Sequence, residues 1–415
     1  MAEKTNVPEI RFAGFTDPWE QRKLGELTTI LSAARVHKEE WRTAGVPFYR
    51  SSDVMAALNG TENERAFISQ ELFEKLSAQS GAPQKGDVMV TGGGSVGTPY
   101  IVPDNKPLYT KDADLIWIKR NAEIDPKFLY SFFMSPIFKS YIRSISHVGT
   151  IAHYTIEQVK ETPLLMPCSI VEQKAIGSFL GDLDSLITLH QRKYDKLCTV
   201  KKSMLEKMFP KPGETEPEIR FDGFTDPWEQ RKLGEFGSVA MCKRIYKEQT
   251  SEQGDVPFFK IGTFGANPDA FISNELFENF KHTYPYPAPG TLLISAAGSI
   301  GRVVEHQGEK AYFQDSNIVW LEHDHRLDDA FLKPLYSQIK WGLEGSTIKR
   351  LYNKDLLSAE VTIPDAREQK EIGQFFAKLD SLITLHQREP QFTDMGYMRV
   401  ERALMTMSMS LFSSS

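Results

Sequence analysis

The sequence predicts an α+β protein with two mixed α/β domains in tandem, separated by long helices that pack as an antiparallel coiled coil. Two matched pairs of segments carry this prediction. Residues 8–26 and 217–235 are identical at all but one of nineteen positions, and residues 172–192 match 368–388 at sixteen of twenty-one. The regions between these blocks are far less similar. The chain is therefore a duplication that kept its frame and let its inserts diverge.

The length and composition agree with two globular domains. The chain has 415 residues, of which 40% are hydrophobic and 25% charged, and a single core stops growing well before that length. Neither a signal peptide nor a membrane span is predicted, so we expect a cytoplasmic protein without a membrane partner. Three cysteines without CxxC spacing support neither a disulfide framework nor a metal site. The net charge of -6 requires any nucleic-acid contact to depend on local basic surface or on a partner.

The matched blocks predict five segments. These are a first domain with its entry motif at 1–171, a central scaffold helix at 172–209, a linker and second domain at 210–367, a second and shortened scaffold helix at 368–389, and an atypical tail at 390–415. Inside the domains, short β-rich runs bounded by Gly, Pro and Asp predict strands at 87–93, 115–119, 291–298 and 317–322. Helices are predicted at 68–78 and 126–144, so each domain mixes both kinds of element.

The central helix is predicted from apolar residues that recur every three or four positions from Glu172 to Phe209, where Pro210 follows. About 37 residues at 1.5 Å each would form a rod of roughly 55 Å, too long to be buried in one domain. Its apolar stripe needs another helix, and the copy that begins at Glu368 supplies one. The predicted packing residues are Ile176, Gly177, Phe179, Leu183, Ile372, Gly373, Phe375 and Leu379. The glycines would let two backbones approach closely, or they merely weaken helices that have no partner.

The end of the second copy departs from the first. Pro390 is predicted to stop the second helix, and the residues after it are predicted to form a loose tail. An alternative is that Val400, Leu404, Met407 and Leu411, which lie at helical spacing, partly replace the missing stripe.

The duplicated PWEQRKLGE entries, the two EQKxIGxF helices and the segment KKSMLEKMFP together resemble the specificity subunit of type I restriction–modification enzymes over nearly the whole chain. This resemblance implies two target-recognition domains that read the two halves of a split double-stranded DNA site. It implies a non-catalytic subunit that binds two modification (methyltransferase) subunits and restriction/translocase subunits. S-adenosylmethionine, ATP and Mg²⁺ are expected on those partners and no cofactor or metal on this chain. A tandem repeat folded through antiparallel helices also generates a pseudo-twofold axis, which suits two identical partners.

Two glycine-rich segments, TGGGSVGTP at 91–99 and SAAGSIGR at 295–302, lack the lysine and GK[ST] ending of a nucleotide-binding loop. Two interpretations remain open for them. They are shared structural turns, or their backbone amides and serine hydroxyls approach a DNA phosphate.

The resemblance places these turns and the segments 147–160 and 344–357 on the DNA face. The nominated DNA-binding residues are Arg50, Ser95, Thr150, His153 and Tyr154 in the first half, and Lys260, Ser299, Thr347, Lys349, Arg350 and Tyr352 in the second. Gln314, Ser316 and Asn317 add amide and hydroxyl groups. Polar and basic side chains of these kinds bond base edges or phosphates, and the alternative for each is an ordinary surface side chain.

Two further motifs superficially suggest catalysis. TDPW, at 16–19 and 225–228, has one proline where an adenine-methyltransferase motif has two, so we expect Trp19 and Trp228 to be buried anchors. PDAREQK at 364–370 resembles part of a nuclease site, but Glu368 and Lys370 fall on the first turn of the helix. An autonomous methyltransferase or nuclease is one alternative function, and a folded but silent or impaired allele with an unproductive C-terminus is another.

Overall fold

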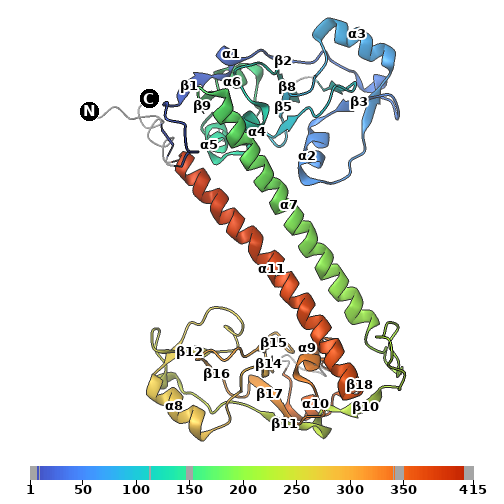
Figure 1. The fold of residues 1–415 in the computed structure, drawn as a ribbon, viewed down its shortest axis with the longest axis vertical. Helices are drawn as coiled ribbons and strands as arrows, with labels where there is room; N and C mark the ends of the chain where they lie inside the picture. Colours follow the sequence, from blue (N-terminus) through green and yellow to red (C-terminus); the bar gives the residue numbers. More distant parts are fainter. Residues whose placement is uncertain are drawn as a thin grey trace, which may run out of the picture. The chain divides into compact units, whose positions relative to one another are not determined.

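The computed structural model describes residues 7–8, 10–111, 114–145, 153–339, 341 and 350–405, with side chains described up to Gln387. It divides into two compact units. One comprises Met1–Gln191 with Arg388–Ser415, and the other comprises Arg192–Gln387. Each unit holds one mixed α/β domain together with part of each long helix (Figure 1).

The first unit contains a four-stranded antiparallel sheet and a three-stranded sheet. The four-stranded sheet has the order β2 (Ile30–Ser32), β8 (Leu115–Ile118), β5 (Val88–Thr91) and β6 (Pro99–Ile101), and the three-stranded one has the order β4 (Ala66–Ile68), β3 (Val46–Tyr49) and β7 (Tyr109–Thr110). Its helices are α1 (Leu24–Leu27), α2 (Ser51–Asn59), α3 (Gln70–Ser80), α4 (Pro126–Met134), α5 (Pro136–Ile145) and α6 (Ile156–Glu161), with a 3-10 turn at Lys38–Glu40. The strands predicted at 87–93 and 115–119 and the helix predicted at 68–78 are confirmed. The helical segment predicted at 126–144 forms two helices, α4 and α5, which are divided at Ser135.

Strand β5 is apolar from Val88 to Val90 because both faces of this central strand are covered. Val88 and Val90 point into the core that also contains Phe128 of α4, whereas Met89 packs on the opposite face against Val54 of α2. Successive strand side chains point to opposite faces, so a strand covered on both sides is apolar throughout.

The second unit repeats this plan with different side chains. Its four-stranded sheet has the order β11 (Gly237–Ala240), β17 (Ile318–His323), β14 (Leu292–Ser295) and β15 (Val303–Glu305), and its three-stranded sheet has the order β13 (Phe271–Ile272), β12 (Val256–Phe259) and β16 (Tyr312–Phe313). Its helices are α8 (Asn274–Thr283), α9 (Asp329–Gln338) and α10 (Asn353–Leu357), with 3-10 turns at Leu233–Glu235 and Lys247–Gln249. The strands predicted at 291–298 and 317–322 are confirmed.

The entry motif closes each domain just before its long helix. In the first unit β1 (Glu20–Lys23) pairs with β9 (Pro163–Met166), and in the second β10 (Glu229–Lys232) pairs with β18 (Glu360–Ile363), both antiparallel. Trp19 and Trp228, which precede these strands, are buried as predicted. The beginning and the end of each domain therefore meet at one place.

The EQK motif joins each domain to its long helix through two buried side chains. Glu172 accepts two bonds from Arg11, at 2.6 and 2.7 Å, and Glu368 accepts two from Arg220, both at 2.7 Å. The side chain of the next residue, Gln173, accepts a bond from the N–H of Asp125 before α4 and donates to the carbonyls of Glu123 and Pro167. Gln369 makes the same three kinds of bond before α9. We call this arrangement the helix joint.

Helix α7 spans Ile170–Lys207, within two residues of the predicted central helix at either end. Within the second unit its later half packs antiparallel to the first half of α11 (Ala366–Met405). Lys201 is paired with Asp380, and the Phe209 ring lies 6.2 Å from that of Phe376, so the two helices run in opposite directions.

The prediction that the second helix ends at Pro390 is wrong, because α11 continues to Met405. A proline inside a helix removes one hydrogen bond and clashes with a carbonyl, at a cost of about 3 kcal/mol. The turns on both sides contribute their own bonds, and the segment 401–404 consists of good helix formers. The predicted loose tail is therefore wrong for the backbone up to 405, while Met407 and Leu411 lie outside the described residues.

The predicted role of the helix glycines is also wrong. A Cβ at Gly177 would lie 2.5 Å from the backbone nitrogen of Phe128, and one at Gly373 would lie 2.7 Å from that of Phe331. Each glycine thus admits the start of α4 or α9, a helix of its own domain, instead of another long helix. Gly181 meets nothing within 4 Å.

Candidate functional site

The glycine-rich segment forms the same tight turn in both units. In the first, the Thr91 hydroxyl donates to the carbonyl of Ser95 and accepts a bond of 2.9 Å from the N–H of Thr98. In the second, Ser295 takes the place of Thr91, donating to the carbonyl of Ser299 and accepting an amide bond of 2.9 Å. Different side chains thus build one backbone shape.

A glycine in this turn is required by an aromatic ring. Gly97 and Gly301 have φ of 83° and 79°, a region that favours glycine. A Cβ at Gly97 would lie 2.4 Å from the Phe138 ring, and one at Gly301 would lie 2.3 Å from the Trp341 ring. The GSxG pattern therefore reflects packing under the turn. Ser95 and Ser299 stay exposed at its tip, so their contact with DNA remains a prediction.

A second segment lies beside each turn. The N–H of Tyr154 donates to the carbonyl of Gly92 at 2.7 Å, and the N–H of Leu351 donates to that of Ala296 at 2.8 Å. The residues just before, His153 and Arg350, are thereby held next to the turn. A Cβ at Gly93 would lie 3.5 Å from the His153 ring, and Arg350 forms a β-bridge with Ala297. His153 and Arg350 thus lie beside the turns. That the segments 147–160 and 344–357 face DNA stays a prediction.

The segment 314–317 adjoins the turn of the second unit. The N–H of Ala296 donates to the carbonyl of Asn317 at 2.8 Å, and the Arg350 guanidinium donates to that of Ser316 at 3.0 Å. The Gln314 side chain accepts from the N–H of Ile261 at 2.9 Å. Ser316, Asn317 and Arg350 therefore lie together beside the turn that carries Ser299, whereas the amide oxygen of Gln314 is already occupied.

The counterparts of this segment in the first unit are not among the residues predicted from the sequence to bind DNA. The N–H of Gly92 donates to the carbonyl of Asp114 at 2.8 Å, as Ala296 does to Asn317. Lys111 occupies the place of Gln314 and is paired with Asp114. The signal was available, since 109–117 and 312–320 share the pattern Y-x-x-D-x-[DN]-[LI]-[IV]-W.

Arg50 and Lys260, two of the predicted DNA-binding residues, differ in how firmly their side chains are held by their own domains. Arg50 bonds Asp53 at 3.0 Å, lies 5.5 Å from the ring centroid of Trp41, and is 23% exposed, so its own domain holds it. Lys260 pairs with Asp269 at 2.9 Å, but both side chains are exposed. An exposed pair contributes little, so Lys260 is free to exchange its partner for a phosphate.

Tyr154 is not available to bind DNA, which corrects its nomination. Its side chain is 2% exposed and its hydroxyl bonds Thr162, and burial raises the pKa of that hydroxyl. The residue lies one position along the segment from His153 and points inward. Tyr352 is 57% exposed, just before α10. Thr150, Thr347 and Lys349 lie outside the described residues.

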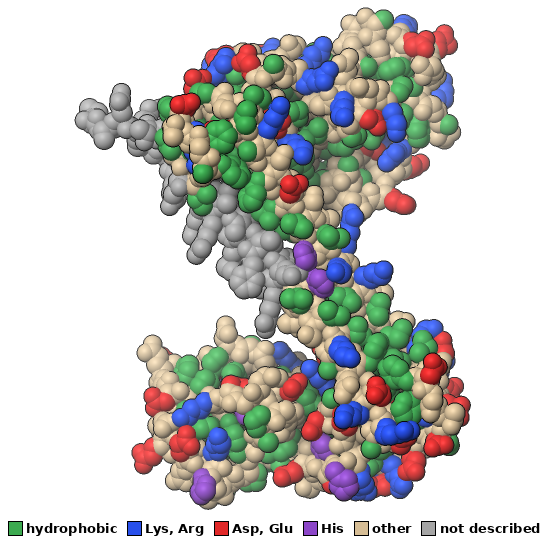
Figure 2. Space-filling view, in the orientation of Figure 1, with side chains coloured by type: hydrophobic (Ala, Val, Ile, Leu, Met, Phe, Trp, Pro, Cys, Tyr) green, Lys and Arg blue, Asp and Glu red, His purple; other side chains and the backbone are tan. Residues whose placement is uncertain are grey.

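Opposite charges are interspersed around the candidate residues. Asp315 pairs with Arg244 at 3.1 Å, and on the face seen in Figure 2 blue and red side chains are mixed over both units. Among the residues described, no three His, Cys, Asp or Glu side chains come together as metal ligands. No described helix is long and apolar enough to cross a membrane.

Comparison with known proteins gives one family over most of the chain. Residues 16–198 and 225–392 match the model described as "Type I restriction modification DNA specificity domain". A putative type I restriction enzyme specificity subunit of Haemophilus influenzae is 52% identical over 153 residues, which cover 36% of this chain and 40% of that protein. A putative type I specificity subunit of Methanocaldococcus jannaschii is 21% identical over 97% of this chain and 95% of its own length.

A solved structure shares the fold. The S subunit of a type I restriction–modification system from M. genitalium superposes with a TM-score of 0.62, covering 96% of this chain and 98% of its own, at 17% identity.

Proposed function

The chain belongs to the type I restriction modification DNA specificity family, and we propose that it is the subunit that gives such a complex its DNA sequence specificity. It is not an enzyme itself. It reads a bipartite, asymmetric site on double-stranded DNA, one half with each domain. It positions two adenine methyltransferase subunits, which hold S-adenosylmethionine, and restriction subunits, which use ATP and Mg²⁺.

The observation that supports this proposal is that both domains contain the same glycine-rich turn, with different side chains around it. The bonds that the hydroxyls of Thr91 and Ser295 make to the backbone of the turn correspond one for one. Beside them, His153 is replaced by Arg350, and Lys111 by Gln314. A turn whose backbone is the same in both domains, while its exposed side chains differ, suits two domains that bind different half-sites.

The chemistry of these side chains fits base reading. Arginine bonds the two acceptors of guanine in the major groove, and asparagine bonds adenine, so Arg350 and Asn317 are the leading candidates in the second unit. Ser95 and Ser299 stand at glycine-rich tips whose small neighbours allow a close approach to phosphate oxygens. The chain as a whole has a net charge of -6. Part of the affinity for DNA must therefore come from partner subunits.

Partner subunits have a candidate surface on each long helix. Leu186 and Leu189 of α7 are 49% and 58% exposed, and Leu382 and Leu385 of α11 are 44% and 51% exposed. These are the same two positions of the repeated block. An exposed apolar pair that occurs once in each copy suits two identical partners, because equivalent surfaces bind equivalent subunits.

The alternative of a silent or impaired allele depended on a helix that stops at Pro390. Since α11 continues to Met405, the main reason to expect an impaired scaffold is weaker. Co-purification with the modification subunits distinguishes the two possibilities, because an impaired scaffold would bring down neither of them.

The test is to co-express the chain with its modification subunits and to map methylated adenines over a genome by single-molecule sequencing. We expect one split motif with two unlike halves around a fixed spacer. An Arg350→Ala variant should relax the half read by the second domain and leave the other half unchanged. A complex that methylates without a split motif would refute the proposal.

A further inference from the structure

The segment 314–317, beside the glycine-rich turn of the second unit, contains a strained residue. Among the described residues other than glycine, Ser316 alone has a positive φ, of 50°. The N–H of Asn317 donates to the carbonyl of Asp315 at 2.5 Å, which closes a tight turn of three residues around Ser316. A side chain rarely takes this conformation, and it persists where neighbouring contacts hold it, often at functional sites. The contacts that hold this turn are therefore of interest.

Two arginines contact the strained turn. The Arg350 guanidinium donates to the carbonyl of Ser316 at 3.0 Å. Arg244, which follows β11, forms an ion pair with Asp315, with its Nε 3.1 Å from Oδ2. The Asp315 side chain is 19% exposed, whereas that of Arg244 is 61% exposed. Over the described part of the chain, Arg244 makes no other ion pair and no side-chain hydrogen bond. Since a guanidinium has five N–H donors, most of those of Arg244 are left for another partner.

The first unit has an arginine at the same place. The strand-central tryptophans of β8 and β17 lie opposite Leu31 of β2 and Ala240 of β11. Four residues further along each segment there is an arginine, Arg35 in the first unit and Arg244 in the second. Arg35 is also exposed. The two arginines are therefore equivalent by strand register and by sequence.

The aspartate recurs as well, while its neighbours change. The fourth residue of the shared pattern Y-x-x-D-x-[DN]-[LI]-[IV]-W is an aspartate in both units. Beside it the second unit has Gln314 and Asn317, where the first has Lys111 and Asp114. An exposed arginine that stays the same while the side chains around it differ suits a contact that both half-sites share. The part of DNA that does not vary with sequence is the phosphate backbone.

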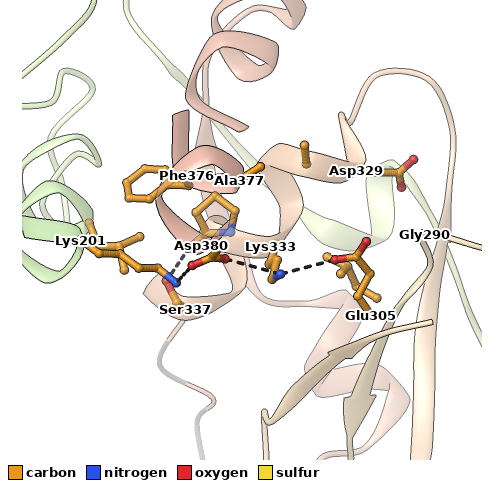
Figure 3. A pocket seen from close by; sticks show the side chains of 13 residues that line it. Lys201, Gly290, Glu305, Asp329, Lys333, Ser337, Phe376, Ala377 and Asp380 are labelled. Atoms are coloured by element: carbon orange, nitrogen blue, oxygen red, sulfur yellow. Dashed lines mark hydrogen bonds and ion pairs between the residues drawn. The ribbon is translucent and has the colours of Figure 1, made fainter. Parts of the chain in front are cut away.

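Another group of cations in the second unit is already neutralised. Lys201 and Lys333 both pair with Asp380 at the edge of a cavity of about 250 Å³ (Figure 3). Lys333 also pairs with Glu305. The first unit does not repeat this group, because no described cation pairs with Asp184, which is at the position of Asp380. Two lysines that two carboxylates already neutralise are a poor site for a phosphate.

We propose that Arg244 and Arg35 each bind a DNA phosphate next to the half-site of their own domain, and that Asp315 orients Arg244 for this contact. This rests on the proposed function, because it concerns the same DNA. A guanidinium matches the geometry of a phosphate, and an exposed ion pair contributes too little to prevent a second contact. Phosphate contacts fix the register of a protein on the duplex, so these arginines would place Arg350 and Asn317 against the bases.

The test uses the chain co-expressed with its modification subunits. Its affinity is measured over a series of salt concentrations, for a duplex with the mapped site and for one with the second domain's half-site replaced. Arg244→Ala should weaken binding by roughly tenfold or more, because a hydrogen bond to a charged group contributes at least that much. The loss should be equal on both duplexes, and the slope of log affinity against log salt should become less steep by about 0.9. Arg35→Ala should give the same result, and neither variant should change the methylated motif.

The matched control is Arg231→Ala, which removes an exposed arginine on β10 that is paired with Glu229. It removes the same charge and should change neither the affinity nor the salt slope. An equal loss of slope in this control would overturn the proposal, since the effect would then be one of net charge. If Arg244 only held the turn around Ser316, Arg244→Ala would relax the half-site of the second domain at an unchanged salt slope, which would also overturn it. An unaltered chain that binds both duplexes equally tightly would instead refute the proposed function, and the slopes would still decide the role of Arg244.

Discussion

Replacing Glu368 by glutamine removes the carboxylate that holds Arg220 in the second helix joint. The two N–H bonds of the guanidinium to that carboxylate are 2.7 Å long, and the side chains are 15% and 1% exposed. Removing one partner of a buried pair costs about 3–5 kcal/mol, because the other charge stays buried without compensation. Arg220 keeps a bond of 2.6 Å to the carbonyl of Asp226. We therefore expect a loss in the free energy of unfolding near the lower limit, about 3 kcal/mol.

The assay is urea denaturation at neutral pH, with calorimetry as a second readout. For a unit of this size, about 3 kcal/mol corresponds to a midpoint lower by roughly 6–12 °C. The matched control is Glu371→Gln, an exposed glutamate on the same helix, which should change stability by no more than about 0.5 kcal/mol. A loss below about 1 kcal/mol for Glu368→Gln would refute the reasoning, since that is the contribution of an exposed pair. Glu172→Gln should cost a similar amount in the first unit.

Three further predictions concern the helix glycines, the two matched aspartates and Arg350. Gly373→Ala should cost about 1–3 kcal/mol in urea denaturation because its Cβ would meet the start of α9 at 2.7 Å, whereas Gly181→Ala, which meets nothing, should stabilise by up to about 1 kcal/mol. Because burial raises the pKa of Asp184 above its ordinary value of 3.8, the stability that this group contributes is present below pH 3.8 and lost as pH rises through the folded pKa. Asp184→Asn should therefore stabilise the chain at neutral pH and have little effect near pH 3, while Asp380→Asn, which breaks an ion pair, should destabilise it at neutral pH. Arg350→Ala should lower discrimination at its half-site by about 1–3 kcal/mol in competition binding to cognate and substituted DNA, and equal weakening on all sequences would show a phosphate contact instead.

The elements that the sequence predicts well are those whose pattern is local. The apolar periodicity of α7 and the continuous apolar runs of β5 and β8 depend on residues close along the chain. Those patterns carry enough information because helix and strand periods differ. The duplication added a check on each prediction, since one fold had to fit both copies.

Two of the wrong predictions concern what lies across from a residue. Gly177 was expected to face another long helix and instead faces α4. Tyr154 was expected at the surface, but the adjacent His153 is the exposed member of that pair. In an extended segment, neighbouring side chains point to opposite sides, so an error of one position exchanges surface for core. Such questions are decided by contacts between residues far apart in the sequence.

The near identity of the matched blocks has a physical reason in the helix joint. Arg220, Trp228, Glu368 and Gln369 all lie within one buried set of contacts that ties the domain to its helix, and the entry strand β10 closes the same domain against β18. Buried polar groups lose much when one partner changes, so this set tolerates little variation. The turn beside Arg350 takes its shape from backbone bonds and from the hydroxyl of Ser295, so the other side chains of the turn can differ. The residues between the matched blocks can therefore change the DNA specificity, while the helix joint still holds each domain on its long helix.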